Sequence, residues 1–147
     1  MTGLYTQELI DHHRAPAHYG VPSCYDCSLT EKNPLCGDEI TLYLRFGPKE
    51  LISWAGFSGP CCAVSKASAS IMVSILEGTT TQTASELVSL AASLRRQESI
   101  CHQPPHAQPL VAFWDSIRAY PVRHKCAEFP WKLLEKALEQ QTQTAKR

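Results

Sequence analysis

The chain has 147 residues, 44% of them hydrophobic, which is enough for one folded domain with a real core, so we expect a single domain over residues 1–147. Its 14 basic and 14 acidic residues give a formal net charge of zero, which argues against nucleic acid as the main partner. No apolar run approaches the ~20 residues that span a bilayer, and the N-terminus lacks the pattern of a secretory signal. We therefore expect a cytoplasmic protein that does not act at a membrane.

The first half of the chain predicts one short helix followed by an antiparallel hairpin. Alternation of Ile40, Leu42, Leu44 and Phe46 with polar residues is typical of a half-buried strand. Pro16 is expected to end the helix that precedes it. The predicted elements are a helix over 4–13, a loop over 17–38, a strand over 39–46, a turn over 47–50 and a strand over 51–57.

The second half predicts helices. After Gly59 and Pro60 the apolar residues recur at helical spacing, and Gly78 is a natural stop for this first helix. Thr83–Glu86 resembles a capping box that opens the next helix, and Pro130 suits the first turn of the last one. The inward residues of the four predicted helices are Val64, Ala67, Ile71 and Ile75; then Ala84, Leu87, Val88, Ala91 and Leu94; then Leu110, Phe113, Trp114 and Ile117; and finally Trp131, Leu134 and Leu138.

A polar loop is expected over 98–109, and residues 140–147 are expected to form a frayed tail. Because the strands come first and the helices after, the sequence predicts an α+β fold. We expect a small antiparallel sheet of about three strands with the helices packed on one of its faces.

Seven cysteines are many for a cytoplasmic chain of this length, and their odd number excludes a complete set of internal disulfides. Four of them lie in three short patches, at residues 33–38, 59–65 and 123–127. Spaced cysteines in a reducing compartment indicate metal ligands or reactive thiols. Folding the three patches together would build one site of sulfur ligands.

Each patch offers suitable ligands. In an extended segment Cys36 and Asp38 would point the same way, and Gly37 between them gives the backbone room to bend. Cys61 and Cys62 lie at a predicted helix start, where free N–H groups and the helix dipole favour a thiolate. Cys126 is expected just before the last helix, next to basic residues. Three sulfurs and one oxygen suit zinc or an iron–sulfur cluster.

The motifs resemble those of the U-type iron–sulfur assembly proteins, the IscU, SufU and NifU N-terminal family. Residues 33–38 (NPLCGD) resemble N-P-x-C-G-D, and residues 57–70 (FSGPCCAVSKASAS) resemble F-x-G-x-G-C-A-I-S-x-A-S-x-S. Residues 11–20 (DHHRAPAHYG) are similar to the D-H-x-x-x-P-x-N-x-G that opens many members. The resemblance covers nearly the whole chain and implies the family's α+β fold.

The third patch resembles the SufU branch. IscU proteins have histidine directly before the third cysteine, whereas this chain has Lys125, as in the SufU pattern R-x-K-C-A-x-x-x-W. The extra segment around 98–109 is also similar to SufU. This resemblance implies a zinc site made of Cys36, Asp38, Cys62 and Cys126, with Cys36 as the sulfur acceptor and Arg123 as an assisting residue. It also implies a cysteine desulfurase of the SufS type as the sulfur donor.

Some residues depart from the family pattern. Cys61 stands where the family has glycine and is either a spare ligand or a small residue tolerated at a helix start. His124 replaces an apolar residue and is either a competing ligand or an exposed histidine. Cys24 and Cys27 form a single CxxC without a family counterpart, so they are reactive or incidental thiols rather than half of a zinc site. Cys101, with His102 and His106, forms a cluster that lacks a fourth ligand.

Three functions remain open at this point. The first is a zinc-dependent sulfur carrier that takes persulfide sulfur from the desulfurase and passes it to the cluster assembly proteins. The second is a scaffold whose same four ligands hold iron or a nascent 2Fe–2S cluster. The third is a non-catalytic docking module in which zinc only stabilises the fold. Lys125 in place of the IscU histidine favours the carrier.

Overall fold

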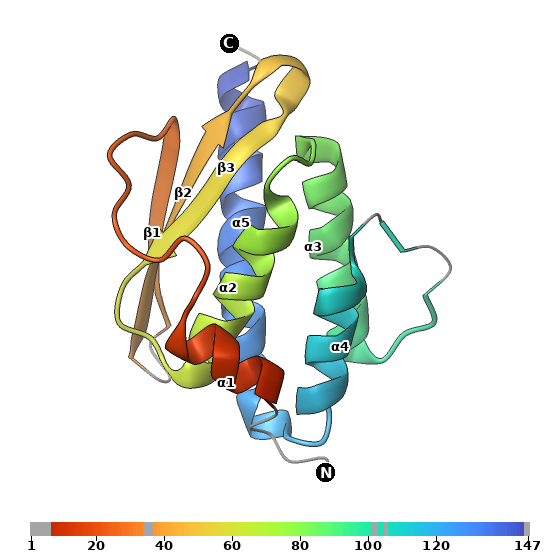
Figure 1. Cartoon of the computed structure of the whole chain (residues 1–147). Helices are drawn as coiled ribbons and strands as arrows, with labels where there is room; N and C mark the ends of the chain where they lie inside the picture. Colours follow the sequence, from red (N-terminus) through yellow and green to blue (C-terminus); the bar gives the residue numbers. More distant parts are fainter. Residues whose placement is uncertain (1–6, 34–36, 101–102, 105, 146–147) are drawn as a thin grey trace.

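The computed structural model describes residues 7–33, 37–100, 103–104 and 106–145. In this part of the chain, a three-stranded antiparallel sheet has its helices packed on one face (Figure 1). The strands are β1 (Cys27–Asn33), β2 (Asp38–Phe46) and β3 (Ile52–Ser58), in the order β1-β2-β3. The helices are α1 (Gln7–Arg14), α2 (Ala63–Leu76), α3 (Thr81–Arg96), α4 (Gln108–Ile117) and α5 (His124–Ala145), with short 3₁₀ turns η1 (Pro48–Glu50) and η2 (Pro121–Arg123). The expected α+β architecture is confirmed.

Helix α2 lies at the centre of the fold, between β3 and the helices α1, α4 and α5. Its predicted apolar face is buried, but so are most of its other residues, including Ser65, Ser68 and Ser70. Small side chains allow this close approach on several sides, and each buried hydroxyl needs a partner. Ser70 accepts a hydrogen bond from the backbone N–H of Ala17 at 2.8 Å and bonds His12 Nδ1 at 2.6 Å, which ties the N-terminal segment to α2.

The loop predicted over 17–38 contains β1, so that prediction is wrong. In β1 the residues alternate between partly buried and exposed, and Leu29 is the one large aliphatic residue. An edge strand that buries only one side carries too few apolar residues for its period to be evident in the sequence. Its pairing with β2, in which Asn33 lies opposite Asp38, is what defines it as a strand.

Two helix starts also differ from the prediction. Thr80, not Thr83, caps α3, because the Thr80 hydroxyl accepts the Thr83 backbone N–H at 3.1 Å. Helix α5 begins at His124, so Pro130 lies inside it rather than in its first turn. The helix also continues to Ala145, so the predicted frayed tail over 140–147 is helical as far as that residue.

The inward faces of the predicted helices are otherwise buried, with one exception. Val88 of α3 is only partly buried, whereas Leu90 is 5% exposed and belongs to the core. The central strand contributes Ile40, Leu42 and Leu44, each at most 1% exposed. None of the helices within the described residues combines the length and the apolar character needed to cross a bilayer.

The two edges of the sheet differ. The segment after α1 bonds to β3, with the Gly20 N–H donating to the Phe57 carbonyl at 2.9 Å and the Phe57 N–H donating to the His18 carbonyl at 3.1 Å. The His18 ring stacks on Trp54, with ring centroids 5.0 Å apart. The β3 edge is therefore partly covered, whereas the outer edge of β1 has no strand partner within the residues that the structure describes.

Candidate metal centre

Asp38 places a buried carboxylate at the first position of β2. The residue is 3% exposed, and both of its oxygens receive hydrogen bonds. Oδ1 accepts the Cys62 backbone N–H at 2.8 Å, and Oδ2 accepts the Ser65 hydroxyl at 2.6 Å. Hydrogen bonds of this kind orient a carboxylate, as is usual for a metal ligand.

Cys62 is the N-cap residue of α2, in agreement with its predicted place at a helix start. Its sulfur accepts the Ser65 backbone N–H at 3.4 Å. The loop before it passes close to β2, because the Pro60 carbonyl accepts the Glu39 N–H at 2.8 Å. Only glycine fits at position 59, where φ is +118° and an added Cβ would lie 2.3 Å from the Glu39 carbonyl oxygen. Gly59 therefore sets the position of Cys62 beside Asp38.

Cys126 lies in the first turn of α5 rather than before the helix, and it is 5% exposed. Pro130, four residues further on, has no N–H to donate to the Cys126 carbonyl, so the helix leaves this carbonyl open to a donor from elsewhere. The Ser65 hydroxyl is 3.0 Å from it, and the Ser68 hydroxyl donates to the Ala127 carbonyl at 2.6 Å. Two serines of α2 thus hold the start of α5 in place.

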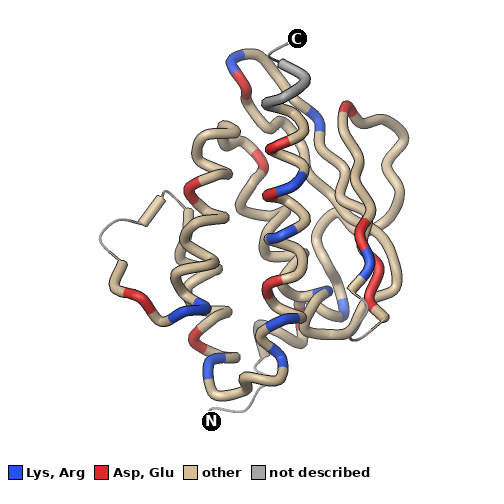
Figure 2. Tube along the Cα trace, turned by 180° about the vertical axis from the view of Figure 1, so that it is seen from behind, with Lys and Arg blue, Asp and Glu red and all other residues tan. Residues whose placement is uncertain are grey.

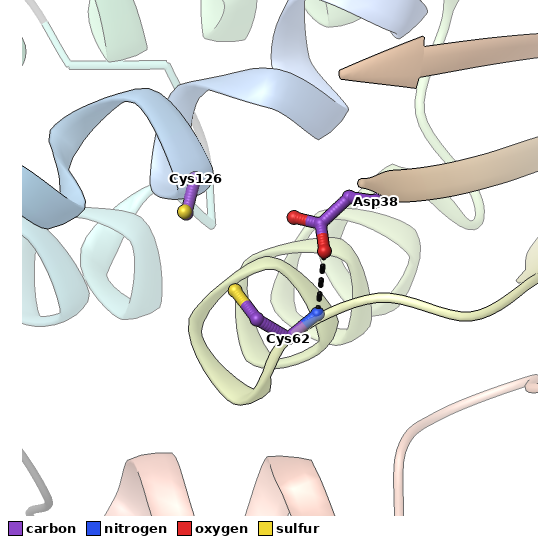
Figure 3. Close-up of side chains that lie close together, drawn as sticks. All are labelled: Asp38, Cys62 and Cys126. Atoms are coloured by element: carbon purple, nitrogen blue, oxygen red, sulfur yellow. Dashed lines mark hydrogen bonds between the residues drawn. The ribbon is translucent and has the colours of Figure 1, made fainter. Parts of the chain in front are cut away.

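The three side chains meet from three separate elements (Figure 3). One carboxylate oxygen of Asp38 and the sulfurs of Cys62 and Cys126 all lie within 4.8 Å of one another. Ligand atoms of a tetrahedral zinc site with Zn–S bonds of ~2.3 Å are roughly 3.8 Å apart, so small side-chain rotations would bring these three to binding distance. Two soft sulfurs and one oriented oxygen fit zinc or iron.

Ser65 lies at the candidate site but is not among the residues that the sequence predicts for it. It contacts all three members of the group: its hydroxyl reaches the Asp38 carboxylate and the Cys126 carbonyl, and its N–H reaches the Cys62 sulfur. The residue is fully buried. Its hydroxyl has one proton, and the Asp38 carboxylate is nearer to it than the Cys126 carbonyl. Two features of the sequence could have indicated this role. One is the position of Ser65 three residues after the N-cap cysteine, and the other is Pro130, which leaves the Cys126 carbonyl without a helical donor.

Cys36, the predicted sulfur acceptor and fourth ligand, lies outside the described residues. Gly37 next to it has φ +74°, and its N–H bonds to the Asn33 carbonyl at 2.9 Å. The predicted extended segment that places Cys36 beside Asp38 includes residues outside those that the structure describes, so it stays a prediction. The predicted bend at Gly37 is confirmed. Arg123, the predicted assisting residue, is partly buried in η2, directly before α5.

Two candidate extra ligands lie outside the three-residue group. Cys61 is partly buried and packs against the hydrophobic core. His124 is partly buried rather than exposed: its Nε2 bonds the Ile117 carbonyl at 3.2 Å, and its ring meets Trp114 edge-on at a centroid distance of 5.6 Å. The His124 ring therefore belongs to the contact between α4 and α5.

Cys24 and Cys27 lie at the opposite end of β1 from Asp38. Cys24 is exposed and accepts a hydrogen bond from Arg45 Nη1 at 3.3 Å. Burial, and to a lesser degree the charge of Asp26, raises the pKa of the half-buried Cys27 thiol. Neither belongs to a metal-binding group among the described residues. Cys101 and His102 lie outside those residues, and His106 is exposed.

Comparison with known proteins places this geometry in context. Residues 4–140 match the family model of the NifU-like N-terminal domain. The chain is 29% identical over 136 residues to the zinc-dependent sulfurtransferase SufU of Bacillus subtilis (strain 168), covering 92% of this chain and 89% of the relative. It is 31% identical over 138 residues to the iron–sulfur cluster assembly scaffold protein IscU of Thermotoga maritima, covering 92% and 93%.

A solved structure is also similar over nearly the whole chain. It is a crystal structure from Fervidobacterium islandicum, of a protein described as an iron–sulfur cluster assembly scaffold for the SUF system. The TM-score is 0.83 at 32% identity, with 92% of this chain and 96% of the other covered. The similar proteins are therefore named as a sulfurtransferase in one case and as scaffolds in the others, at nearly equal sequence identity.

Proposed function

Because this chain belongs to the family of NifU-like N-terminal domains, we propose that it acts in iron–sulfur cluster assembly as a zinc-dependent sulfur carrier. The observation that carries the proposal is the group of Asp38, Cys62 and Cys126, in which two sulfurs and an oriented carboxylate oxygen converge. We propose that Cys36 completes the set. The sulfur donor would be a cysteine desulfurase of the SufS type, and the acceptors would be downstream cluster assembly proteins.

A bound zinc ion would hold its sulfur ligands as thiolates at neutral pH, and three thiolates with one carboxylate would leave the centre with a net charge of −2. The chain supplies compensation through the N-terminus of α2, where Cys62 is the cap, and through Arg123, three residues before Cys126. Arg123 would help to dock the desulfurase or to orient the Cys36 thiolate.

Sulfur transfer itself needs no net oxidation. The Cys36 thiolate attacks the outer sulfur of the persulfide on the desulfurase, and a new S–S bond forms to Cys36. The S–S bond in the donor breaks, its cysteine leaves as a thiolate, and the outer sulfur keeps its proton. Cys62 and Cys126 would remain as anchors, while Asp38, the hard ligand among soft ones, would keep the site able to exchange a ligand.

Lys125 supports the carrier rather than the scaffold. Its side chain is exposed and lines a groove on the outer side of α5, and it is not part of the Asp38–Cys62–Cys126 group. The position directly before Cys126 therefore offers no histidine ligand for a cluster. The B. subtilis relative, a zinc-dependent sulfurtransferase by name, supports the same assignment.

The test incubates zinc-loaded protein with a SufS-type desulfurase and cysteine, traps the thiols and locates the added sulfur by mass spectrometry. We expect one extra sulfur atom on the peptide that contains Cys36 and none in the Cys36→Ser variant. Cys24→Ser is a matched control, because Cys24 is an exposed thiol far from the group. If Cys36 gains no sulfur while the desulfurase turns over, the carrier proposal is wrong.

A scaffold role is the second candidate, and the T. maritima relative named as a scaffold favours it. The same ligands would then hold a 2Fe–2S cluster as cargo. Anaerobic reconstitution should in that case give visible absorption that passes to an apo-acceptor. Zinc at one equivalent that resists replacement by iron would count against the scaffold. A docking module stabilised by zinc would instead lose stability, but not selectively sulfur delivery, when Cys36 is replaced by serine.

A further inference from the structure

A groove of about 320 Å³ runs between β1 and the outer face of α5. The β1 residues that line it are consecutive, Glu31–Asn33, although neighbouring side chains of a strand point to opposite faces. The backbone edge of the strand therefore forms this wall. The lining residues of α5 run from Lys125 to Lys136 at spacings of three and four, which makes the other wall a single stripe of the helix.

The β1 wall is an open strand edge. Within the described residues β1 pairs only with β2, so half of its N–H and C=O groups point away from the sheet. Such an edge is a template for one more strand. The floor beside it is apolar, with Leu133 1% exposed and Phe129 partly buried against the core.

The groove carries more positive than negative charge, with four lysines against two glutamates. Both glutamates are engaged: Glu31 bonds Lys136 at 2.7 Å, and Glu128 pairs with Arg95 at 3.3 Å. Lys32, Lys125 and Lys132 are exposed, and no ion pair joins them to a described residue. Figure 2 shows basic and acidic residues interleaved along α5. The lining as a whole is therefore net positive, which favours a ligand with carboxylates.

The groove begins next to the candidate metal centre. Asn33 pairs with Asp38 across the β1–β2 register, and Lys125 directly precedes Cys126. The Glu31–Lys136 ion pair lies toward the other end of the α5 stripe. Eleven helical rises from Lys125 to Lys136 give a length of about 16 Å, which corresponds to roughly five residues of extended chain.

We propose that this groove binds an extended acidic segment of a partner protein, which adds to β1 as a fourth strand. Side chains on one face of the segment would cover Phe129 and Leu133, with Lys125 and Lys132 beside them on α5. Carboxylates on its other face would lie on the side of Lys32, because Glu31 next to Lys32 is the residue that faces α5. Such a segment would tether the partner within reach of the metal centre. Binding of a segment does not depend on sulfur transfer, so it can be measured without a desulfurase.

The test uses fluorescein-labelled heptapeptides and the full chain, with binding followed by fluorescence anisotropy. The first probe alternates glutamate and valine, and the second alternates lysine and valine. Two further acidic probes carry N-methyl groups on alternate amides, in the two complementary registers. Because the alternation of valine and glutamate fixes which amides face β1, one methylated register should abolish binding and the other should not. Hydrogen exchange of β1 amides reports the place of binding.

We expect the acidic probe to bind, the basic probe not to bind, and the β1 amides to gain protection. The double variant Lys32→Glu/Lys132→Glu should weaken binding on the order of tenfold or more, because two attractions become repulsions. Lys49→Glu, an exposed lysine in the η1 turn, is the matched control and should bind as the unaltered chain does. Absence of binding by the acidic probe, equal binding by the double variant, or equal binding of both methylated registers would overturn the proposal. So would dimerisation of the chain through β1, which would make a second copy the occupant.

Discussion

Replacing Ser65 by alanine tests how the chain holds its candidate metal ligands. The hydroxyl lies 2.6 Å from Asp38 Oδ2 and 3.0 Å from the Cys126 carbonyl, so Ser65→Ala removes one donor from the carboxylate and from the turn that carries a sulfur. Of the two Cys62 contacts, the Ser65 N–H to the sulfur survives the substitution, whereas the bond from the Cys62 thiol to the Ser65 hydroxyl at 3.5 Å is lost. The variant therefore releases Asp38 and the Cys126 turn and loosens Cys62, while the side chains of all three stay present.

The expected loss follows from the type of hydrogen bond. A bond to a charged group contributes about 1.5–3 kcal/mol, and removing a residue that orients a metal ligand costs roughly 10- to 100-fold in affinity. At about 1.4 kcal/mol for each factor of ten, this loss of affinity corresponds to about 1.4–2.8 kcal/mol of binding free energy. We therefore expect Ser65→Ala to bind zinc roughly 10- to 100-fold more weakly.

Ser68→Ala is the matched control for this experiment. Ser68 is equally buried, lies one turn later on α2 and donates to the Ala127 carbonyl at 2.6 Å, a neutral acceptor that belongs to none of the three group members. Loss of a bond to a neutral acceptor costs about 0.5–1.5 kcal/mol of stability. Competition with a chromophoric zinc chelator gives the affinity, and urea unfolding of metal-free protein gives the stability. If Ser65→Ala binds zinc as tightly as the unaltered chain, or if Ser65→Ala and Ser68→Ala lose equal zinc affinity, then the Ser65 hydroxyl does not orient the ligands.

Three more predictions concern other residues of the fold. Pro130→Ala restores an N–H toward the Cys126 carbonyl, so in a urea double-mutant cycle Ser65→Ala should cost about 0.5–1.5 kcal/mol less in that background; additive effects would contradict this. The Cys27 thiol has a pKa raised above its ordinary value of 9.0, so the unfolded chain ionises first and stability should fall as pH rises above about 9. Cys27→Ala should flatten that fall in pH-dependent unfolding, and an unchanged slope would argue against it. His124→Ala should lower stability by about 1 kcal/mol and leave zinc affinity unchanged, whereas a loss of affinity would make the histidine a ligand.

The parts of the fold that the sequence predicts best are those with a strong apolar period. The alternation in β2 matches the burial of Ile40, Leu42 and Leu44, although Phe46 is only partly buried and Tyr43 between them is buried as well. The helical spacing of Leu110, Phe113, Trp114 and Ile117 matches a buried face. Strand β1 escapes such reasoning, because an edge strand needs few apolar residues and is defined by its pairing with β2. Pro130 is a second exception. By itself it favours the first turn of a helix, but here it lies inside α5, where Ser65 of α2 bonds the Cys126 carbonyl that Pro130 leaves without a helical donor.

The candidate site shows the same division. Three cysteine-containing patches predict one site, and the structure brings Asp38, Cys62 and Cys126 together from a strand, a helix cap and a helix start. Ser65 could not be assigned from its neighbours in the sequence, because its role depends on two elements far away in the chain. The same holds for His124, whose contact with Ile117 exists only after α4 and α5 pack.

The most direct test of the proposed carrier function combines metal analysis and sulfur mapping on one sample. Gently purified protein is analysed for metals, then given a SufS-type desulfurase and cysteine, and the trapped thiols are mapped by mass spectrometry. We expect one equivalent of zinc and one added sulfur atom on Cys36, and no added sulfur in the Cys36→Ser variant. Protein that carries iron and labile sulfide in place of zinc, or zinc-loaded protein whose Cys36 gains no sulfur, would contradict it.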